Sequence, residues 1–279
     1  MSVASDITRK ARSNLAFALK ILPLDLRDDM VVFYAFCRVM DDLADAPAIP
    51  ADVRSASLEH WKRGIVHGFE QPTEFELEVL SLRDRHEIPN ENLAAIIEGC
   101  QMDLQPQRFE TWDDLANYIW KVACAVGLVS IRILGCKDPA SERYAVALGR
   151  ALQLTNILRD VEEDLANGGR IYLPIADLAR FNYTPEDLTA RVWDDRFVAL
   201  MNDQASKANQ YFHEAAAAHS EVDRQALLAA EIMGEIYHAL LDQMKADRFR
   251  VFSKRYGVSM PHKIAILTKH LVARALQIG

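Results

Sequence analysis

Acidic residues recur at a spacing of four in two separate segments of the sequence. In MVVFYAFCRVMDDLAD, Asp41 and Asp45 follow an apolar run, and in QLTNILRDVEED, Asp160 and Asp164 repeat the spacing. Residues four apart on an α-helix share one face, so each pair would present two carboxylates side by side. Two such pairs facing each other across a bundle could hold a diphosphate through shared Mg²⁺, which prefers a few carboxylate oxygens plus substrate phosphates.

The first segment is hard to explain as a solvated surface. Its apolar residues predict a buried helix over residues 30–45, and like charges four residues apart repel by about 0.2–0.5 kcal/mol even on an open helix. Ionised carboxylates in a core must be paired or bound to metal, and Arg38 alone cannot neutralise Asp41, Asp42 and Asp45. We therefore expect bound cations and a phosphate ester as substrate.

The second segment is ambiguous on its own. A rotation of 100° per residue places one polar stripe beside an apolar one and directs Glu162 to the far side. This pattern alone favours an amphipathic helix with a solvated acidic face. The polar stripe consists of Gln153, Asn156, Asp160, Glu163 and Asp164.

A diphosphate leaving group would also require a sheltered space for the carbocation that it leaves behind. Metal and cationic side chains draw off the diphosphate, and an apolar, aromatic-lined cavity protects the cation from water. Ordinary core packing explains any one candidate lining residue at least as well. The candidates are Tyr118, Trp120, Val122, Val126 and Leu128.

The elements that position these residues are predicted to be helices throughout. Apolar residues recur with a period of 3.6, and no stretch alternates for long as a strand would. Pro, Gly and Asn mark the breaks, and no linker or repeat divides the chain, so residues 1–279 are expected to form one all-α domain. The predicted helices lie near 24–46, 51–69, 74–86, 90–102, 112–135, 139–167, 193–219, 222–249 and 260–276.

The composition excludes several classes of protein. A net charge of −8 and a pI near 5.5 argue against a nucleic-acid binder. The four cysteines lack metal-site spacing and are expected to be reduced core residues. The run 122–131 is about half as long as a bilayer span requires, and the N-terminus lacks the pattern of a secretory signal, so a cytoplasmic location is expected.

Taken together, FYAFCRVMDDLAD, QLTNILRDVEED and GGRIYLP resemble the squalene/phytoene synthase family. The resemblance extends to ILPLDLRDD, EGCQMDLQ, YIWKVACAVG and IYHALLDQMKADRFRVFSKR, and so spans almost the whole chain. It implies an all-α, isoprenoid-synthase-type bundle around a central apolar cavity. In that family, two prenyl diphosphates join head to head through a cyclopropylcarbinyl diphosphate.

The resemblance also implies roles for individual residues. Asp41, Asp45, Asp160 and Asp164 correspond to the Mg²⁺-binding aspartates, and with them Tyr118 and Tyr172 are assigned to the catalytic group. A surface ion pair explains Arg159 nearly as well, whereas Arg38 is hard to explain structurally within an apolar helix. The positions matched to the diphosphates are Tyr34, Arg38, Gln153, Asn156, Arg159, Arg170 and Tyr237.

Several alternatives remain open from the sequence. Two farnesyl diphosphates giving presqualene diphosphate or squalene are favoured over two geranylgeranyl diphosphates giving phytoene. DDLAD also fits the DDxxD motif of head-to-tail prenyltransferases and terpene cyclases, and a non-catalytic assembly factor is a further alternative. NADPH use and oligomeric state are undetermined, and peripheral membrane association would suit release of an apolar product.

Overall fold

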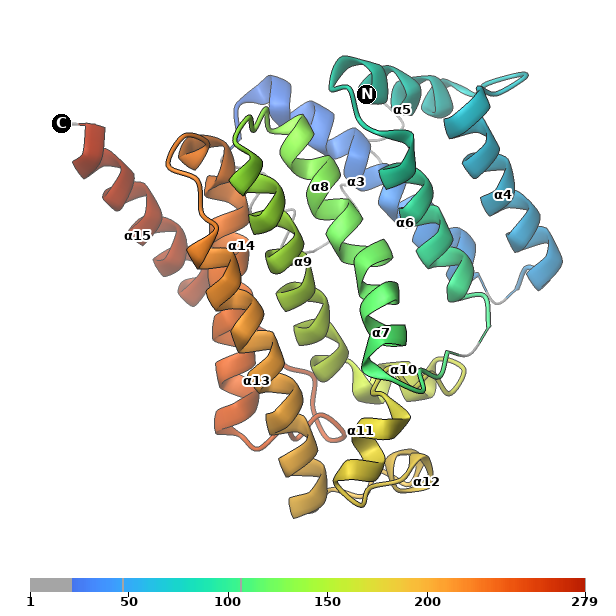
Figure 1. Ribbon diagram of the computed structural model, residues 1–279, viewed down its shortest axis with the longest axis vertical. Coiled ribbons are helices and arrows are strands. Elements are labelled where there is room, and N and C mark those ends of the chain that lie inside the picture. The colour runs from blue at the N-terminus through green and yellow to red at the C-terminus, as the bar shows by residue number, and fades with distance from the viewer. Residues whose placement is uncertain (1–21, 47, 106, 279) are drawn as a thin grey trace.

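The computed structural model describes residues 22–46, 48–105 and 107–278, and these residues form an all-α bundle (Figure 1). The all-α prediction is confirmed. The helices of the first half are α3 (Leu24–Asp45), α4 (Ala51–His67), α5 (Glu74–Arg85), α6 (Asn90–Met102), α7 (Trp112–Ile119), the π-helical turn η2 (Trp120–Cys124) and α8 (Ala125–Ile133). Those of the second half are α9 (Pro139–Arg159), α10 (Val161–Ala166), α11 (Ile175–Arg180), α12 (Pro185–Thr189), α13 (Asp195–Ala217), α14 (Arg224–Ala246) and α15 (Met260–Ile278).

Periodicity located the long helices but missed their interruptions. The helix predicted over 112–135 contains the π turn, and the one predicted over 139–167 is divided at Asp160, which ends α9 and precedes α10. Helices α11 and α12 were not predicted, because six and five residues are too few to show a period of 3.6.

Helices α8 and α9 run in opposite directions through the middle of the bundle (Figure 1). They approach closely because glycines face main chain across the contact. A Cβ on Gly127 would lie 2.9 Å from the carbonyl oxygen of Ala145, and one on Gly149 would lie 2.9 Å from that of Ala123. Helices α3 and α6 pack on one side of this pair, and α13 and α14 pack on the other.

The short helices α10, α11 and α12 gather at one end of the bundle, at the bottom of Figure 1. A tight reversal at Gly168 and Gly169, both with positive φ, leads the chain out of α10. The amide of Arg170 then donates to the carbonyl of Asp164 (3.0 Å), and the amide of Ile171 donates to Gln107 (3.1 Å). The reversal therefore brings the GGRIYLP segment beside the chain that follows α6.

Two helices bear on the relation to membranes. The continuous helical stretch Trp112–Ile133 is long and apolar enough to cross a bilayer, but it packs between α6 and α9 as a core helix. Helix α15, by contrast, projects from the bundle and packs on α14 (Figure 1). Its inner side chains are Ile266 and Leu267, which contact an apolar cluster on α14.

Candidate active site

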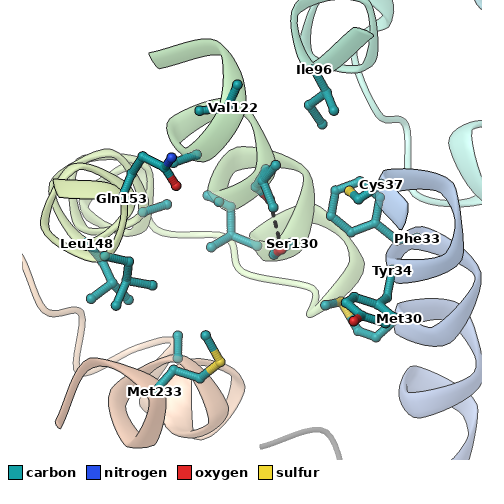
Figure 2. Close-up of a pocket in the computed structure, with 18 of the residues that line it drawn as sticks. Met30, Phe33, Tyr34, Cys37, Ile96, Val122, Ser130, Leu148, Gln153 and Met233 are labelled. Atoms are coloured by element: carbon teal, nitrogen blue, oxygen red, sulfur yellow. Dashed lines mark hydrogen bonds between the residues drawn. The ribbon is translucent and has the colours of Figure 1, made fainter. Parts of the chain in front are cut away.

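A cavity of about 480 Å³ lies between α3, α6, α8, α9 and α14. Figure 2 shows side chains of these helices surrounding it, among them Phe33 of α3, Leu148 of α9 and Met233 of α14. The walls are largely apolar, and the volume falls in the range of small-molecule sites. The structure thus contains the apolar chamber that the sequence predicted.

The two ends of the cavity differ in chemistry. Asp41, Gln153, Asn156 and Tyr237 line one end, and the Oδ1 atom of Asn156 is buried without a hydrogen-bond partner among the described residues. The opposite end is lined by the buried side chains of Leu22, Met30, Leu134 and Tyr144. At 1.5 Å per residue, the wall from Asp41 back to Met30 is about 16 Å long. A polar head and an apolar tail would each find a matching end.

The acidic residues of α3 are not buried as predicted. Asp41, Asp42 and Asp45 are exposed, and the buried face of the helix consists of residues such as Phe36, Met40 and Ala44. The prediction was wrong because part of the helix, including Tyr34 and Cys37, lines the cavity instead of filling a closed core. Asp41 itself faces that cavity, where water reaches it.

The carboxylates at the polar end carry more negative charge than nearby cations offset. Desolvation by the surrounding protein raises the pKa of Asp41 to about 7. The hydrogen bond from the Cys100 thiol opposes this rise, and the charge of Asp45 adds to it. Desolvation and the neighbouring Asp160 likewise raise the pKa of Asp164 to about 7. A cation bound here would relieve this repulsion.

The second acidic segment bends at Asp160. The Nε atom of Arg159 donates to Asp160 (2.7 Å), and Arg255 approaches Glu163 (3.1 Å). Glu162 points away from the cavity and pairs with Arg191 (2.7 Å), so its predicted orientation is confirmed. Arg159, whose alternative was a surface ion pair, is mostly buried and interacts with the Tyr237 phenol.

Arg170 connects the two acidic motifs. Its guanidinium donates to the Oδ1 atom of Asp45 (2.8 Å) and to the carbonyl of Asp103 (3.1 Å), and its backbone amide bonds to Asp164. Residues separated by more than a hundred positions therefore meet at one end of the bundle. The predicted proximity of the two motifs is confirmed by these contacts.

Tyr118 and Tyr172 converge on an aspartate. The Tyr118 hydroxyl donates to Oδ2 of Asp103 (2.8 Å) and the Tyr172 hydroxyl to Oδ1 (2.9 Å). Burial raises the pKa of Asp103, against the opposing effect of the two phenols. Both rings stack near Phe109. The carboxylate thus fixes where both phenols point.

Only part of the predicted cavity lining is correct. Val122 and Val126 line the cavity, whereas Tyr118, Trp120 and Leu128 are not among the residues of its wall. The prediction assumed an uninterrupted α-helix, but the amide of Ala125 bonds to the carbonyl of Trp120 five residues back. The additional residue in this turn separates the stripe of α7 from that of α8.

Asp103 was missed by the sequence analysis. It follows α6 as the C-cap residue, in the quoted segment EGCQMDLQ, but no acidic partner lies four residues away to draw attention to it. The available signal was a lone carboxylate directly after an apolar helix. Arg38, by contrast, was predicted, and the structure pairs it with Asp42 (2.7 Å) at a half-exposed position. Its assignment to phosphate stays a prediction.

Comparisons with known proteins agree with this geometry. The sequence profile described as squalene/phytoene synthase matches residues 8–262. The chain is 32% identical to a 15-cis-phytoene synthase from Synechocystis, over 95% of this chain and 82% of that protein. It is 33% identical to a presqualene diphosphate synthase from Rhodopseudomonas palustris, over 93% of each.

The chain belongs to the squalene/phytoene synthase family. A solved dehydrosqualene synthase with bound ligand superposes with a TM-score of 0.82 at 28% identity, covering 98% of this chain and 95% of that one. The family consists of prenyltransferases of isoprenoid biosynthesis that join prenyl diphosphates head to head. The relatives differ in substrate, so membership establishes the reaction class and leaves the length of the prenyl chain open.

The donors at the polar end suit the divalent cation on which this family depends. Among the described residues, no three His, Cys, Asp or Glu side chains form a ready metal cage. Mg²⁺ does not require one, since it keeps waters and accepts substrate phosphates beside one or two carboxylates. Asp41, Asp164 and the unpartnered Oδ1 of Asn156 offer oxygen ligands of the preferred kind.

Proposed function

We propose that this chain condenses two farnesyl diphosphates head to head into presqualene diphosphate, in a reaction that depends on Mg²⁺. The observation that carries the proposal is the contact of both aspartate motifs through Arg170, together with an apolar cavity whose polar end includes Asp41 of the first motif. In this arrangement a diphosphate would lie among the carboxylates and its prenyl chain would lie along the cavity.

The length of the cavity supports a C15 chain. Extended at about 1.2 Å per bond, a farnesyl chain spans roughly 13 Å and a geranylgeranyl chain roughly 18 Å. The wall between Asp41 and Met30 measures about 16 Å. The side chains of Met30, Leu134 and Tyr144 line the far end, so the shorter chain would fit and the longer one would press against them.

The residues at the polar end bind and orient the diphosphate. The guanidiniums of Arg170 and Arg159 offer planar N–H donors that match phosphate oxygens. Asp41, Asp45, Asp160 and Asp164 would hold Mg²⁺, which neutralises the charge that develops on the leaving diphosphate. The amide of Gln153 and the phenol of Tyr237 complete the polar wall.

The remaining residues control the carbocation. The apolar side chains of the cavity exclude water, which would otherwise capture the allylic cation. Phe33 and Tyr34 place aromatic rings along the wall, where a cation can be stabilised by their faces. Asp103 holds the phenols of Tyr118 and Tyr172 in fixed positions below this end of α7.

A second candidate is the condensation of two geranylgeranyl diphosphates to phytoene. The similarity to the Synechocystis phytoene synthase favours it, since the identity equals that to the presqualene diphosphate synthase within one percentage point. The two candidates share the metal site and differ only in what the apolar end accepts.

Product analysis by mass spectrometry decides between them. The purified chain is incubated with farnesyl or geranylgeranyl diphosphate, with Mg²⁺ or with EDTA, and with or without NADPH. We expect presqualene diphosphate from farnesyl diphosphate with Mg²⁺ only. Phytoene formed from geranylgeranyl diphosphate, with no product from farnesyl diphosphate, would establish the second candidate, and squalene formed only with NADPH would add a reductive step.

A further inference from the structure

The last 32 residues differ in charge from the rest of the chain. From Arg248 to Gly279 the sequence contains seven Lys and Arg residues and no Asp or Glu. The preceding 247 residues therefore hold 25 basic and 40 acidic residues, a net charge of −15. Five of these bases pair with acidic side chains, so among the described residues Lys263 and Arg274 are the two bases of this segment without an ion pair.

Helix α15 lies within this segment and exposes apolar side chains. Of the described side chains of α15, only Ile266 is buried against α14, beside the half-buried Leu267. The exposed residues are Met260 (57% exposed), Ile264 (51%), Leu271 (44%), Val272 (51%) and Leu276 (78%). An uncovered apolar surface of this kind marks a contact with something outside the described structure.

The exposed residues form an ordered pattern around α15. At 100° per residue, the five side chains occupy an arc of about 160°. Lys263 and Arg274 border one edge of the arc, and Lys269 borders the other, where it pairs with Glu235 (2.8 Å). Within the described part of the chain, Lys263 and Arg274 form no ion pair.

We propose that α15 is an interfacial helix that docks the protein on an anionic lipid bilayer. An apolar arc bordered by bases, with no acidic residue on the helix, is the composition that lies in the plane of a membrane surface. Lys263 and Arg274 reach toward lipid phosphates while the apolar arc enters the boundary of the acyl chains.

Charge complementarity favours a bilayer over a second copy of this chain. Two copies meeting through α15 would bring Lys263 and Arg274 of each chain close to one another, whereas an anionic surface neutralises them. The acidic body, with its net charge of −15, is repelled by the same surface. The protein therefore lies on the membrane through the face of α15 that carries Lys263 and Arg274.

The proposed orientation relates the bilayer to the cavity. Helix α14 supplies Ala229, Ala230 and Met233 to the cavity wall and turns Ile232 and Ile236 toward α15. One layer of helix, about 10 Å, thus separates the docked helix from the chamber. The docking itself does not depend on which reaction the chamber performs.

Sedimentation with vesicles tests the proposal on the full chain without substrate. Vesicles of phosphatidylcholine are compared with vesicles of phosphatidylcholine and phosphatidylglycerol, at low and high salt. We expect binding to the anionic vesicles only, weakened by salt. Lys263→Glu with Arg274→Glu, and separately Leu271→Ser with Leu276→Ser, should each reduce vesicle binding by at least about tenfold.

Matched controls separate a specific surface from general charge. Arg63→Glu with Arg143→Glu makes the same change of charge on exposed positions of α4 and α9, and Val53→Ser with Leu77→Ser removes exposed apolar side chains from α4 and α5. Both pairs should bind vesicles within about twofold of wild type.

Three results would overturn the proposal. The first is equal binding to both kinds of vesicle, or none to either. The second is a dimer in light scattering that Leu271→Ser with Leu276→Ser converts to a monomer, since α15 would then be a protein interface. The third is exchange protection of the outer face of α15 that disappears when residues 1–21 are deleted, since the chain itself would then cover the helix.

Discussion

Neighbouring aspartates on α3 provide an internal comparison at the scale of single residues. Asp41→Asn or Asp45→Asn should lower turnover by at least about 100-fold, because each removes a charged oxygen ligand. Relief of like-charge repulsion, about 0.5 kcal/mol, should leave Tm unchanged or raise it by about 1–2 °C. Steady-state kinetics and thermal melts measure both effects.

Asp42→Asn and Glu162→Gln serve as controls for that prediction. Asp42 pairs with Arg38, and Glu162 pairs with Arg191 away from the cavity. Each should retain turnover within about twofold of wild type, since exposed ion pairs contribute little. A comparable loss at Glu162 would remove the distinction between metal-binding and surface carboxylates on which the site depends.

Asp103 should affect turnover through the phenols of Tyr118 and Tyr172, from which it accepts hydrogen bonds. Asp103→Asn keeps the shape but can accept from only one phenol through its single carbonyl oxygen, so kcat should fall by about 10–100-fold, equivalent to about 1.5–3 kcal/mol. In a Tyr118→Phe background the same change should have a much smaller effect on kcat. The double-mutant cycle measures this coupling.

A structural role for Asp103 would give a different result. Asp177 is a buried aspartate that accepts from Gln204 (2.7 Å) and Lys207 (2.7 Å) away from the cavity. Asp177→Asn should lower Tm and leave kcat unchanged. Additive losses of kcat for Asp103→Asn and Tyr118→Phe would mean that Asp103 does not position Tyr118.

The attachment of α15 illustrates chemistry at the scale of elements. His270 lies between Glu231 (3.6 Å) and Glu235 (2.8 Å) of α14, with Lys269 on Glu235 and His219 on Glu231. The hydrogen bond to Glu231 raises the pKa of His270. Desolvation opposes this rise, and Glu235 adds to it. Protonated His270 therefore stabilises the packing of α15 on α14.

The sign of the pH dependence follows from this shift. Because the pKa of His270 is higher in the folded chain than its unfolded value of about 6.5, the stabilisation is complete below pH 6.5 and is lost as pH rises through the folded value. His270→Gln should reduce stability by about 1 kcal/mol at pH 6, with a loss that shrinks by pH 9. Thermal melts measure this difference in stability between wild type and His270→Gln, and a difference that stays constant across this pH range would contradict the prediction.

The accuracy of the sequence analysis also differed between elements. Long helices were located because apolar residues repeated over many turns. Glu162 was oriented correctly because the helical hydrogen bonds from Asp160 to Asn156 and from Asp164 to Asp160 persist across the division. Burial of the acidic residues of α3 was predicted wrongly, since an apolar side chain has the same pattern whether it faces a packed core or a hollow one. Asp103 was missed, because its partners are contributed by α7 and by the GGRIYLP segment.

At the scale of the whole molecule, the closed end of the cavity should select the length of the prenyl chain. Met30→Ala extends the chamber and should raise the ratio of geranylgeranyl to farnesyl diphosphate use by about tenfold. Met40→Ala is the control, since Met40 is buried on the same helix but does not line the cavity. Competition assays with both substrates provide the ratio.

Both methionine variants lose core contacts and should be destabilised by about 2–5 kcal/mol. A change of substrate ratio that occurs in Met30→Ala and not in Met40→Ala therefore does not arise from lower stability. Met30→Val provides a milder substitution if Met30→Ala does not fold. An unchanged ratio in a folded Met30 variant would show that the chain length is selected elsewhere in the molecule.

The π turn between α7 and α8 makes the protein sensitive to the number of residues at one place more than to their identity. Substitutions within Trp120–Cys124 leave the count unchanged, so Tyr118 still points to Asp103 and Val126 to the cavity. Deleting any one of these five residues would restore a regular helix and rotate α7 by about 100° against α8. Point variants in this turn would therefore keep the register between α7 and α8, whereas a single-codon deletion would disconnect the tyrosine from its aspartate.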